Sequence, residues 1–190
     1  MPLQIQAAKT ALVVIDLQKG ITAHKGAPHD SRTVVANASR LADAFRSRGG
    51  YVVLVRVAFT DGKDALRPIT DQPPASAAAR PSDWADIVEE MHLSPSDHIV
   101  TKRQWGAFFG TDLDLQLRRR GIETIVLCGI STNIGVEMTA REAFQHHYQQ
   151  IFAVDAMTAM SAEEHEHTAK YIFPRIGRVR TTDEIVNAMD

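Results

Sequence analysis

Short apolar runs alternate with amphipathic stretches along most of the chain. Runs rich in Val and Ile, such as Ala11–Leu17 and Ile122–Cys128, have the length and composition of buried parallel strands. Between such runs, Ser31–Arg48 places apolar residues at helical spacing and is followed by Gly49 and Gly50, which end a helix. Repeated strand–helix units of this length predict a three-layer α/β/α fold: a six-stranded, mostly parallel, Rossmann-like sheet with helices on both faces.

The expected elements follow one another without an internal repeat or a linker, so the 190 residues are expected to form a single domain, 1–190. The expected strands are Ala11–Leu17, Tyr51–Val57, Asp97–Thr101, Ile122–Cys128, Gln150–Val154 and Arg178–Arg180. The expected helices are Ser31–Arg48, Trp84–Met91, Asp112–Arg120, Thr132–His147, Ala162–Tyr171 and Thr182–Met189, the last capped by Thr181 or Thr182. The stretch Thr60–Pro81, rich in Pro, Ala and Asp, is expected to run as a long excursion over the sheet ends.

Composition limits the partners and the compartment. A net charge of −2 gives no reason to expect nucleic acid or an anionic membrane as a partner. No apolar run is long enough to span a bilayer, and the first residues lack the pattern of a secretory signal. Cys128 is the single cysteine, which excludes an internal disulfide and favours a reducing cytoplasm.

Two residues whose side chains can take part in catalysis lie at the ends of expected strands. Asp16 interrupts an apolar strand, where a carboxylate is costly unless it is paired; it is either a structural loop cap or a general acid or base. Lys102 ends another strand and precedes a loop with Trp105, Phe108 and Phe109 among glycines. Aromatic residues on such a loop are typical of pocket walls, and they can equally form a subunit interface.

The stretch Ile125–Ala143 is typical of a buried strand, a tight turn and the start of a helix, which in open α/β sheets presents a reactive group at the strand's carboxyl end. Gly135 stands where a nucleophile would sit. The turn is not a G-x-S-x-G elbow, and the chain has neither a P-loop nor a dinucleotide fingerprint. Cys128 lies within the strand, away from the exposed, positive environment that activates a thiol, and is expected to be a core residue. An acid and an amine without a nucleophile indicate chemistry without a covalent intermediate.

The eight histidines do not form a recognisable metal site. His165 and His167 would project to different sides of a helix, and Glu163–His167 is expected to be a solvated helix face. We therefore expect no metal and no cofactor.

Three segments together resemble the isochorismatase-like hydrolase family, also called the cysteine hydrolase superfamily: Val13–Gln18, Lys102–Asp112 and Cys128–Arg141. The resemblance implies a parallel six-stranded sheet, a small-molecule substrate and a homo-oligomer. Amidases of the family use an Asp-Lys-Cys triad, so the implied catalytic positions are Asp16, Lys102 and, in place of the cysteine, Gly135. It also implies a cis Ile130–Ser131 peptide bond. The implied substrate-binding residues are Gln18, Trp105, Phe108, Ile130, Ser131, Asn133 and Ile134.

The chain also departs from known branches of that family. Val57–Gly62 lacks the Asp-x-His pair of the zinc-binding nicotinamidases, and Ser131–Asn133 stands where characterised isochorismatases carry a histidine. The leading hypothesis is a metal-independent hydrolase of a small carboxylate-type substrate, with Asp16 donating a proton or positioning a water. Lys102 would hold Asp16, and backbone N–H groups near Asn133–Gly135 would bind an anion. The alternatives are a non-catalytic binding protein and a thiol amidase using Cys128.

Overall fold

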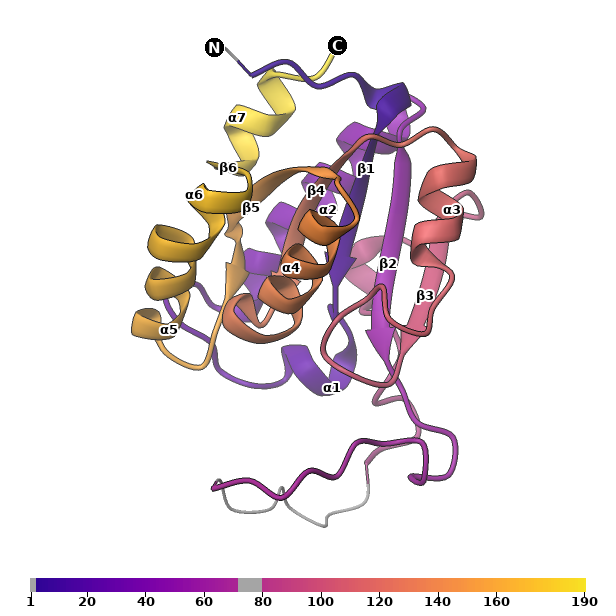
Figure 1. Ribbon diagram of the computed structural model, residues 1–190, viewed down its shortest axis with the longest axis vertical. Coiled ribbons are helices and arrows are strands. Elements are labelled where there is room, and N and C mark those ends of the chain that lie inside the picture. The colour runs from indigo at the N-terminus through magenta and orange to yellow at the C-terminus, as the bar shows by residue number, and fades with distance from the viewer. Residues whose placement is uncertain (1–2, 72–79) are drawn as a thin grey trace.

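The computed structural model describes residues 3–71 and 80–190 and confirms the predicted fold class. Its sheet has six strands in the order β3-β2-β1-β4-β5-β6, and every adjacent pair is parallel. The strands are β1 (Thr10–Ile15), β2 (Tyr51–Val57), β3 (His98–Lys102), β4 (Thr124–Ile130), β5 (Gln149–Thr158) and β6 (Arg178–Arg180). Figure 1 shows helices on both faces of this sheet.

Helices and helical turns precede, connect and follow the strands. In chain order they are η1 (Ala7–Lys9), α1 (Lys19–Thr22), α2 (Ser31–Ser47), η2 (Glu89–Met91), α3 (Leu113–Arg119), η3 (Thr132–Val136), α4 (Glu137–Gln145), α5 (Ala162–His167), η4 (Thr168–Ile172), α6 (Phe173–Ile176) and α7 (Thr182–Asn187). Asp30 caps α2 by accepting a hydrogen bond from the Thr33 N–H. Thr181, one of the two predicted caps, forms a capping box with Glu184 at the start of α7.

Period-two alternation along the buried strands creates two cores. In β1, Leu12 and Val14 face the core that includes α2 and α7, whereas Ala11, Val13 and Ile15 face the core that includes α3, α4 and α6. All six residues of β1 are buried, as expected for a central parallel strand covered on both sides. This double burial fixes the register of β1 and therefore the position of the residue that follows it.

Several predicted elements differ from the observed ones. The expected helix Trp84–Met91 is wrong for most of its length, because only Glu89–Met91 forms a helical turn; residues 84–88 lie along the end of β1, with Gln18 bridged to Ile87. The expected helix Thr132–His147 begins as the π-helical turn η3. The helix expected at Ala162–Tyr171 is α5 continued by the π-helical turn η4. Strand β5 runs four residues beyond its expected end at Val154, to Thr158.

The strand order reverses between β1 and β4, since β2 and β3 lie on one side of β1 while β5 and β6 lie beyond β4. Ligands of open α/β sheets bind at such a switch point, outside the carboxyl ends of the strands. Gly129 lets the two strand ends approach closely: its φ is 119°, and a Cβ there would lie 2.1 Å from the Ile15 carbonyl oxygen. Both chain termini lie at the opposite end of the sheet (Figure 1).

Part of the predicted excursion Thr60–Pro81 falls on residues 72–79, outside the described residues. Its described part, before residue 72, contains no regular element and extends from the carboxyl end of β2 (Figure 1). No helix among residues 3–71 and 80–190 combines the length and apolarity needed to cross a bilayer.

Candidate active site

Asp16 and Lys102 form a buried ion pair at the switch point. The Lys102 Nζ atom lies 2.8 Å from Asp16 Oδ2 and also donates to the Trp105 carbonyl oxygen at 2.7 Å. Lys102 is only 2% exposed and Asp16 only 5%. Lys102 ends β3, two strands away from β1, so its long side chain crosses the end of β2 to reach the carboxylate. The predicted convergence of these two residues is therefore confirmed.

The environment of Asp16 raises its pKa to about 6. Burial is the larger influence, and the Lys102 ammonium opposes it by favouring the carboxylate through charge and a hydrogen bond. Oδ2 accepts from Lys102, while buried Oδ1 has no hydrogen-bond partner within the described chain. A carboxyl group with one free oxygen and a pKa near neutrality can exchange a proton with a ligand.

The backbone of Asp16 adopts an uncommon conformation, with φ at +54°. Asp and Asn tolerate this left-handed region better than other non-glycine residues. The Asp16 N–H donates to the Val55 carbonyl oxygen at 2.9 Å, which anchors the turn to β2. The carboxylate is thereby directed away from the strand and toward the cavity above the sheet ends.

Gly135 completes this arrangement from η3. A Cβ at this position would lie 3.2 Å from Asp16 Oδ2, 3.4 Å from Lys102 Nζ and 3.1 Å from the Ile15 side chain. These distances place position 135 directly against the ion pair. The preceding Ile130–Ser131 peptide bond is cis, as predicted.

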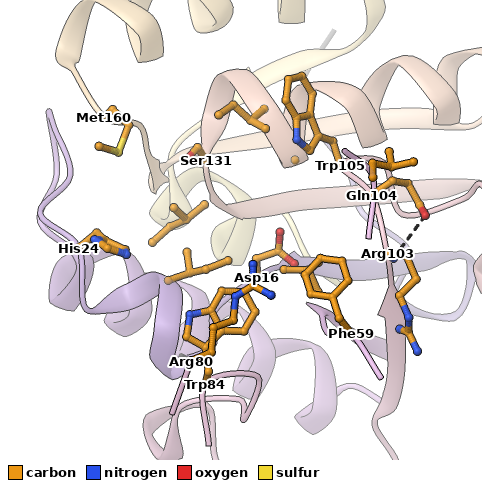
Figure 2. Close-up of a pocket in the computed structure, with 16 residues that line it drawn as sticks. Asp16, His24, Phe59, Arg80, Trp84, Arg103, Gln104, Trp105, Ser131 and Met160 are labelled. Atoms are coloured by element: carbon orange, nitrogen blue, oxygen red, sulfur yellow. Dashed lines mark hydrogen bonds between the residues drawn. The ribbon is translucent and has the colours of Figure 1, made fainter. Parts of the chain in front are cut away.

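A cavity of about 390 Å³ opens above the pair (Figure 2). Most of its lining is apolar, and its polar residues are Asp16, His24, Arg80, Arg103, Gln104 and Ser131. Such a cavity suits a small organic ligand with few polar groups. The lining residues are Asp16, Ile21, His24, Val57, Phe59, Leu66, Arg80, Trp84, Arg103, Gln104, Trp105, Ile130, Ser131, Ile134, Gly135 and Met160.

Four of the predicted substrate-binding residues line this cavity: Trp105, Ile130, Ser131 and Ile134. Their contact with a substrate stays a prediction. Asn133 does not line the cavity, and its buried Oδ1 has no hydrogen-bond partner within the described chain. The expected anion site on the Asn133–Gly135 backbone has fewer available N–H groups than predicted, because the Ile134 N–H already donates to the Ser131 carbonyl.

The structure corrects the expected positions of Gln18 and Phe108. Gln18 is fully buried behind the cavity wall; its side chain accepts from the Val57 N–H and donates to the Val57 and Trp84 carbonyls. Phe108 packs into the core against the His146 and Tyr148 rings instead of facing the cavity. A buried amide beside three backbone groups is a clamp between segments, and Phe108 anchors its loop to the core.

The loop that carries Trp105 is tied to the helix that begins at the site. The Thr139 hydroxyl donates to the Gly135 carbonyl at 2.7 Å and accepts from the Ala107 N–H at 3.2 Å. Glu142 accepts from the Phe108 N–H at 2.9 Å. The loop after β3 and the turn after β4 are thereby held in one arrangement around Lys102.

Cys128 is fully buried inside β4, next to Val14 of β1. Burial raises the pKa of its thiol well above the ordinary value. The cysteine does not line the cavity, in agreement with the prediction of a core residue.

The expectation that Glu163–His167 is a solvated face is wrong for His165. This side chain is buried, its Nδ1 lies 2.8 Å from the Thr132 hydroxyl, and its ring meets His29 edge to face. Burial lowers the pKa of His165. Within residues 3–71 and 80–190, no three His, Cys, Asp or Glu side chains gather closely enough to hold a metal ion.

Sequence reasoning missed much of the cavity wall, above all Phe59, Arg80 and Trp84. These residues lie in or beside the Pro-rich stretch, which has no periodicity from which a side-chain direction can be predicted. The one available signal was the expectation that this stretch runs over the sheet ends, where the site also lies.

A parallel sheet with a buried acid–amine pair below a small, mostly apolar cavity defines a hydrolase-like α/β protein. The isochorismatase domain model matches residues 10–184, and the chain belongs to the isochorismatase family. It is 61% identical to the family protein YwoC of Bacillus subtilis (strain 168), over 97% of this chain and 96% of that protein. An isochorismatase family protein of Burkholderia thailandensis superposes with a TM-score of 0.93 at 42% identity, covering 99% and 98% of the two chains.

Two more distant relatives have names that state an activity or a biosynthetic process. Ureidoacrylate amidohydrolase RutB of Stutzerimonas stutzeri (strain A1501) is 28% identical over 90% of this chain and 78% of its own length. Phenazine biosynthesis protein PhzD1 of Pseudomonas aeruginosa is 28% identical over 96% of this chain and 87% of its own length. The chain is therefore a hydrolase of a family that contains amidohydrolases.

Proposed function

We propose that this protein hydrolyses a small carboxylate-type substrate, such as a vinyl ether, without a metal and without a covalent intermediate. The observation that carries the proposal is the Asp16 carboxyl group: it is buried, lines the cavity, has a pKa of about 6 and keeps Oδ1 free of protein partners in the described chain. These are the properties of a general acid that works near neutral pH.

In the proposed reaction, protonated Asp16 donates its proton to the vinyl carbon, which creates an oxocarbenium ion. Water adds to this ion and returns a proton to the Asp16 carboxylate. The resulting hemiketal breaks its C–O bond to give a ketone and an alcohol. Asp16 gives up one proton and regains one in each turnover, and water is the nucleophile, so no nucleophilic side chain is required.

Lys102 would hold the carboxylate and tune its pKa. Its ammonium donates to Asp16 Oδ2 and to the Trp105 carbonyl, which holds one carboxyl oxygen and leaves the buried Oδ1 without a partner in the described chain. The ammonium also stabilises Asp16 after proton transfer, when the carboxylate carries its charge. Lys102 thus acts on the reaction mainly through Asp16.

Gly135 would take the place of the nucleophilic cysteine of related amidases. A side chain at position 135 would begin within 3.4 Å of both Asp16 and Lys102, as a triad requires. With glycine there, the space can hold water or part of the substrate. We therefore expect enol ethers, and not amides, to be turned over.

The two alternatives make different demands on the site. A thiol amidase using Cys128 requires an accessible thiolate, whereas this thiol is fully buried with a raised pKa. A non-catalytic binding protein needs the cavity but not a carboxyl group that titrates near neutrality. Asp16, buried at some cost in stability, favours an enzyme over a binding protein.

The test is a screen of purified protein against isochorismate, simple enol ethers and simple amides, with Asp16→Asn as the control variant. We expect hydrolysis of an enol ether that Asp16→Asn abolishes, because the amide keeps the shape but has no acidic proton. Binding of these compounds without turnover would support the binding-protein alternative. Amide hydrolysis that is lost in Cys128→Ala would establish the thiol mechanism instead.

A second experiment tests the place of position 135. The Gly135→Cys variant should carry a thiol beside Lys102, which lowers a thiol pKa and speeds its alkylation by iodoacetamide. Cys128 in the parent protein provides the internal reference for a buried, slowly reacting thiol. Equal alkylation rates for parent and variant would contradict the assignment of position 135 to the nucleophile's place.

A further inference from the structure

The cavity wall contains a cation that no side chain of the described chain neutralises. The Arg80 guanidinium lies between two aromatic rings, with Cζ 4.7 Å from the Phe59 ring centre and 4.6 Å from the Trp84 ring centre. Within residues 3–71 and 80–190, Arg80 has no hydrogen bond and no ion pair to a carboxylate. Figure 2 shows Arg80 and Trp84 next to each other among the residues that line the cavity.

The other two cations at the cavity are already engaged. Lys102 is bound to Asp16 and to the Trp105 carbonyl. Arg103 donates to Asp64 at 2.7 Å. Arg80 is therefore the cation in the described lining that is available to an anionic ligand.

The Trp84 ring, which supports the Arg80 guanidinium, is held in place by contacts with α1 and Gln18. The Trp84 ring lies directly on Gly20 of α1, where a Cβ would come within 2.0 Å of ring atoms. The Trp84 carbonyl accepts from the Gly20 N–H at 2.9 Å and from the Gln18 side chain at 3.2 Å. Backbone and ring are thus both fixed, and the ring in turn supports the guanidinium by a cation–π contact.

The geometry points to Arg80 as the residue that binds the carboxylate of the substrate. The cation–π contacts with the two rings use no N–H group of the guanidinium, so these donors remain for a ligand, and they match a carboxylate in bidentate geometry. The ligand's body would meet the apolar wall formed by Ile21, Val57, Leu66, Ile130, Ile134 and Met160. This inference rests on the proposed function for its substrate class, and it makes Arg80 a specificity residue for small organic monoanions.

Binding of benzoate and of its neutral analogue benzamide, measured by isothermal titration calorimetry, tests this without turnover. Wild-type protein should bind benzoate more tightly than benzamide. Arg80→Met should weaken benzoate about tenfold or more and leave benzamide unchanged, because a charged hydrogen-bond partner is lost. Arg80→Lys should recover only part of the affinity, since an ammonium cannot make the bidentate contact.

The matched control is Arg119→Met, which removes the same charge from an exposed position on α3 and should leave benzoate binding unchanged. Equal benzoate affinity in Arg80→Met and wild type, or no preference of wild type for benzoate over benzamide, would overturn the inference. Inorganic phosphate that displaces benzoate at equal concentration would also overturn it, in favour of a phosphate site. The binding test and the hydrolysis screen fail independently: lost turnover with intact Arg80-dependent benzoate binding refutes only the proposed reaction.

Discussion

Replacing Lys102 by Met tests how the site sets the pKa of Asp16. In the wild type, burial raises the pKa to about 6 although the Lys102 ammonium lies only 2.8 Å away. An opposite charge at this range lowers a carboxyl pKa by about 1–3. The Lys102→Met variant keeps the apolar length and removes the charge, so the pKa of Asp16 should rise by about that amount.

The consequence for protonation is large at neutral pH. With a pKa of about 6, roughly one Asp16 carboxyl in ten is protonated at pH 7. After the substitution, most of the Asp16 carboxyl groups should be protonated at this pH. The carboxyl group should then remain in its acid form up to a higher pH than in the wild type. Enol-ether hydrolysis in the wild type should fall about tenfold per pH unit above pH 6. In the variant this fall should move to higher pH.

The assay is carbon NMR of protein labelled at the aspartate carboxyl carbons, titrated from pH 3 to pH 9, with the signal assigned by its absence from Asp16→Asn. A wild-type Asp16 that titrates at or below pH 4 would refute the reasoning, because the ammonium would then outweigh burial. So would a pKa in Lys102→Met that is unchanged or lower than in the wild type.

Four further predictions use simpler measurements. Because the pKa of Asp16 is raised, the native state holds this proton more tightly than the unfolded chain does. The resulting contribution to the free energy of unfolding, about 3 kcal/mol, is fully present below about pH 4 and is lost as the pH rises through 6. Urea unfolding at pH 4 and at pH 7 should show this loss in the wild type and not in Asp16→Asn. Cys128→Ala should keep hydrolytic activity, with a loss of unfolding free energy of about 1–3 kcal/mol from the cavity it creates; an inactive, folded variant would contradict the noncovalent mechanism. Gly20→Ala should displace the Trp84 ring, seen as a shifted tryptophan emission, and weaken benzoate binding; unchanged emission and affinity would show that the contact of Trp84 with Gly20 does not position Arg80. The chain should self-associate, since Trp105 is 59% and Phe109 75% exposed on one loop, and light scattering that finds only the 21.0 kDa monomer at micromolar concentration would contradict this.

The pattern of apolar and polar residues in the sequence was enough to predict the sheet and the positions of Asp16, Lys102 and Gly135 at one edge of it. Apolar runs separated by amphipathic stretches predict a parallel sheet, because the strands that such runs form must be buried on both faces. Asp16, Lys102 and the turn at Gly135 each follow such a run, and the carboxyl ends of parallel strands share one edge of the sheet. Their convergence could therefore be predicted without coordinates.

Tertiary structure alone decided which neighbouring residues face the cavity. Gln18 follows Asp16 by two residues, yet its side chain is buried and links two backbone segments. Phe108 follows Lys102 by six residues, yet it packs into the core. Arg80 and Trp84 come from a stretch without periodicity, and their place depends on the contact of a ring with Gly20, which is 64 residues away from Trp84 in the sequence. The balance between burial and the Lys102 charge is also a property of the folded site, because the dielectric environment of Asp16 exists only once the two cores have packed around it.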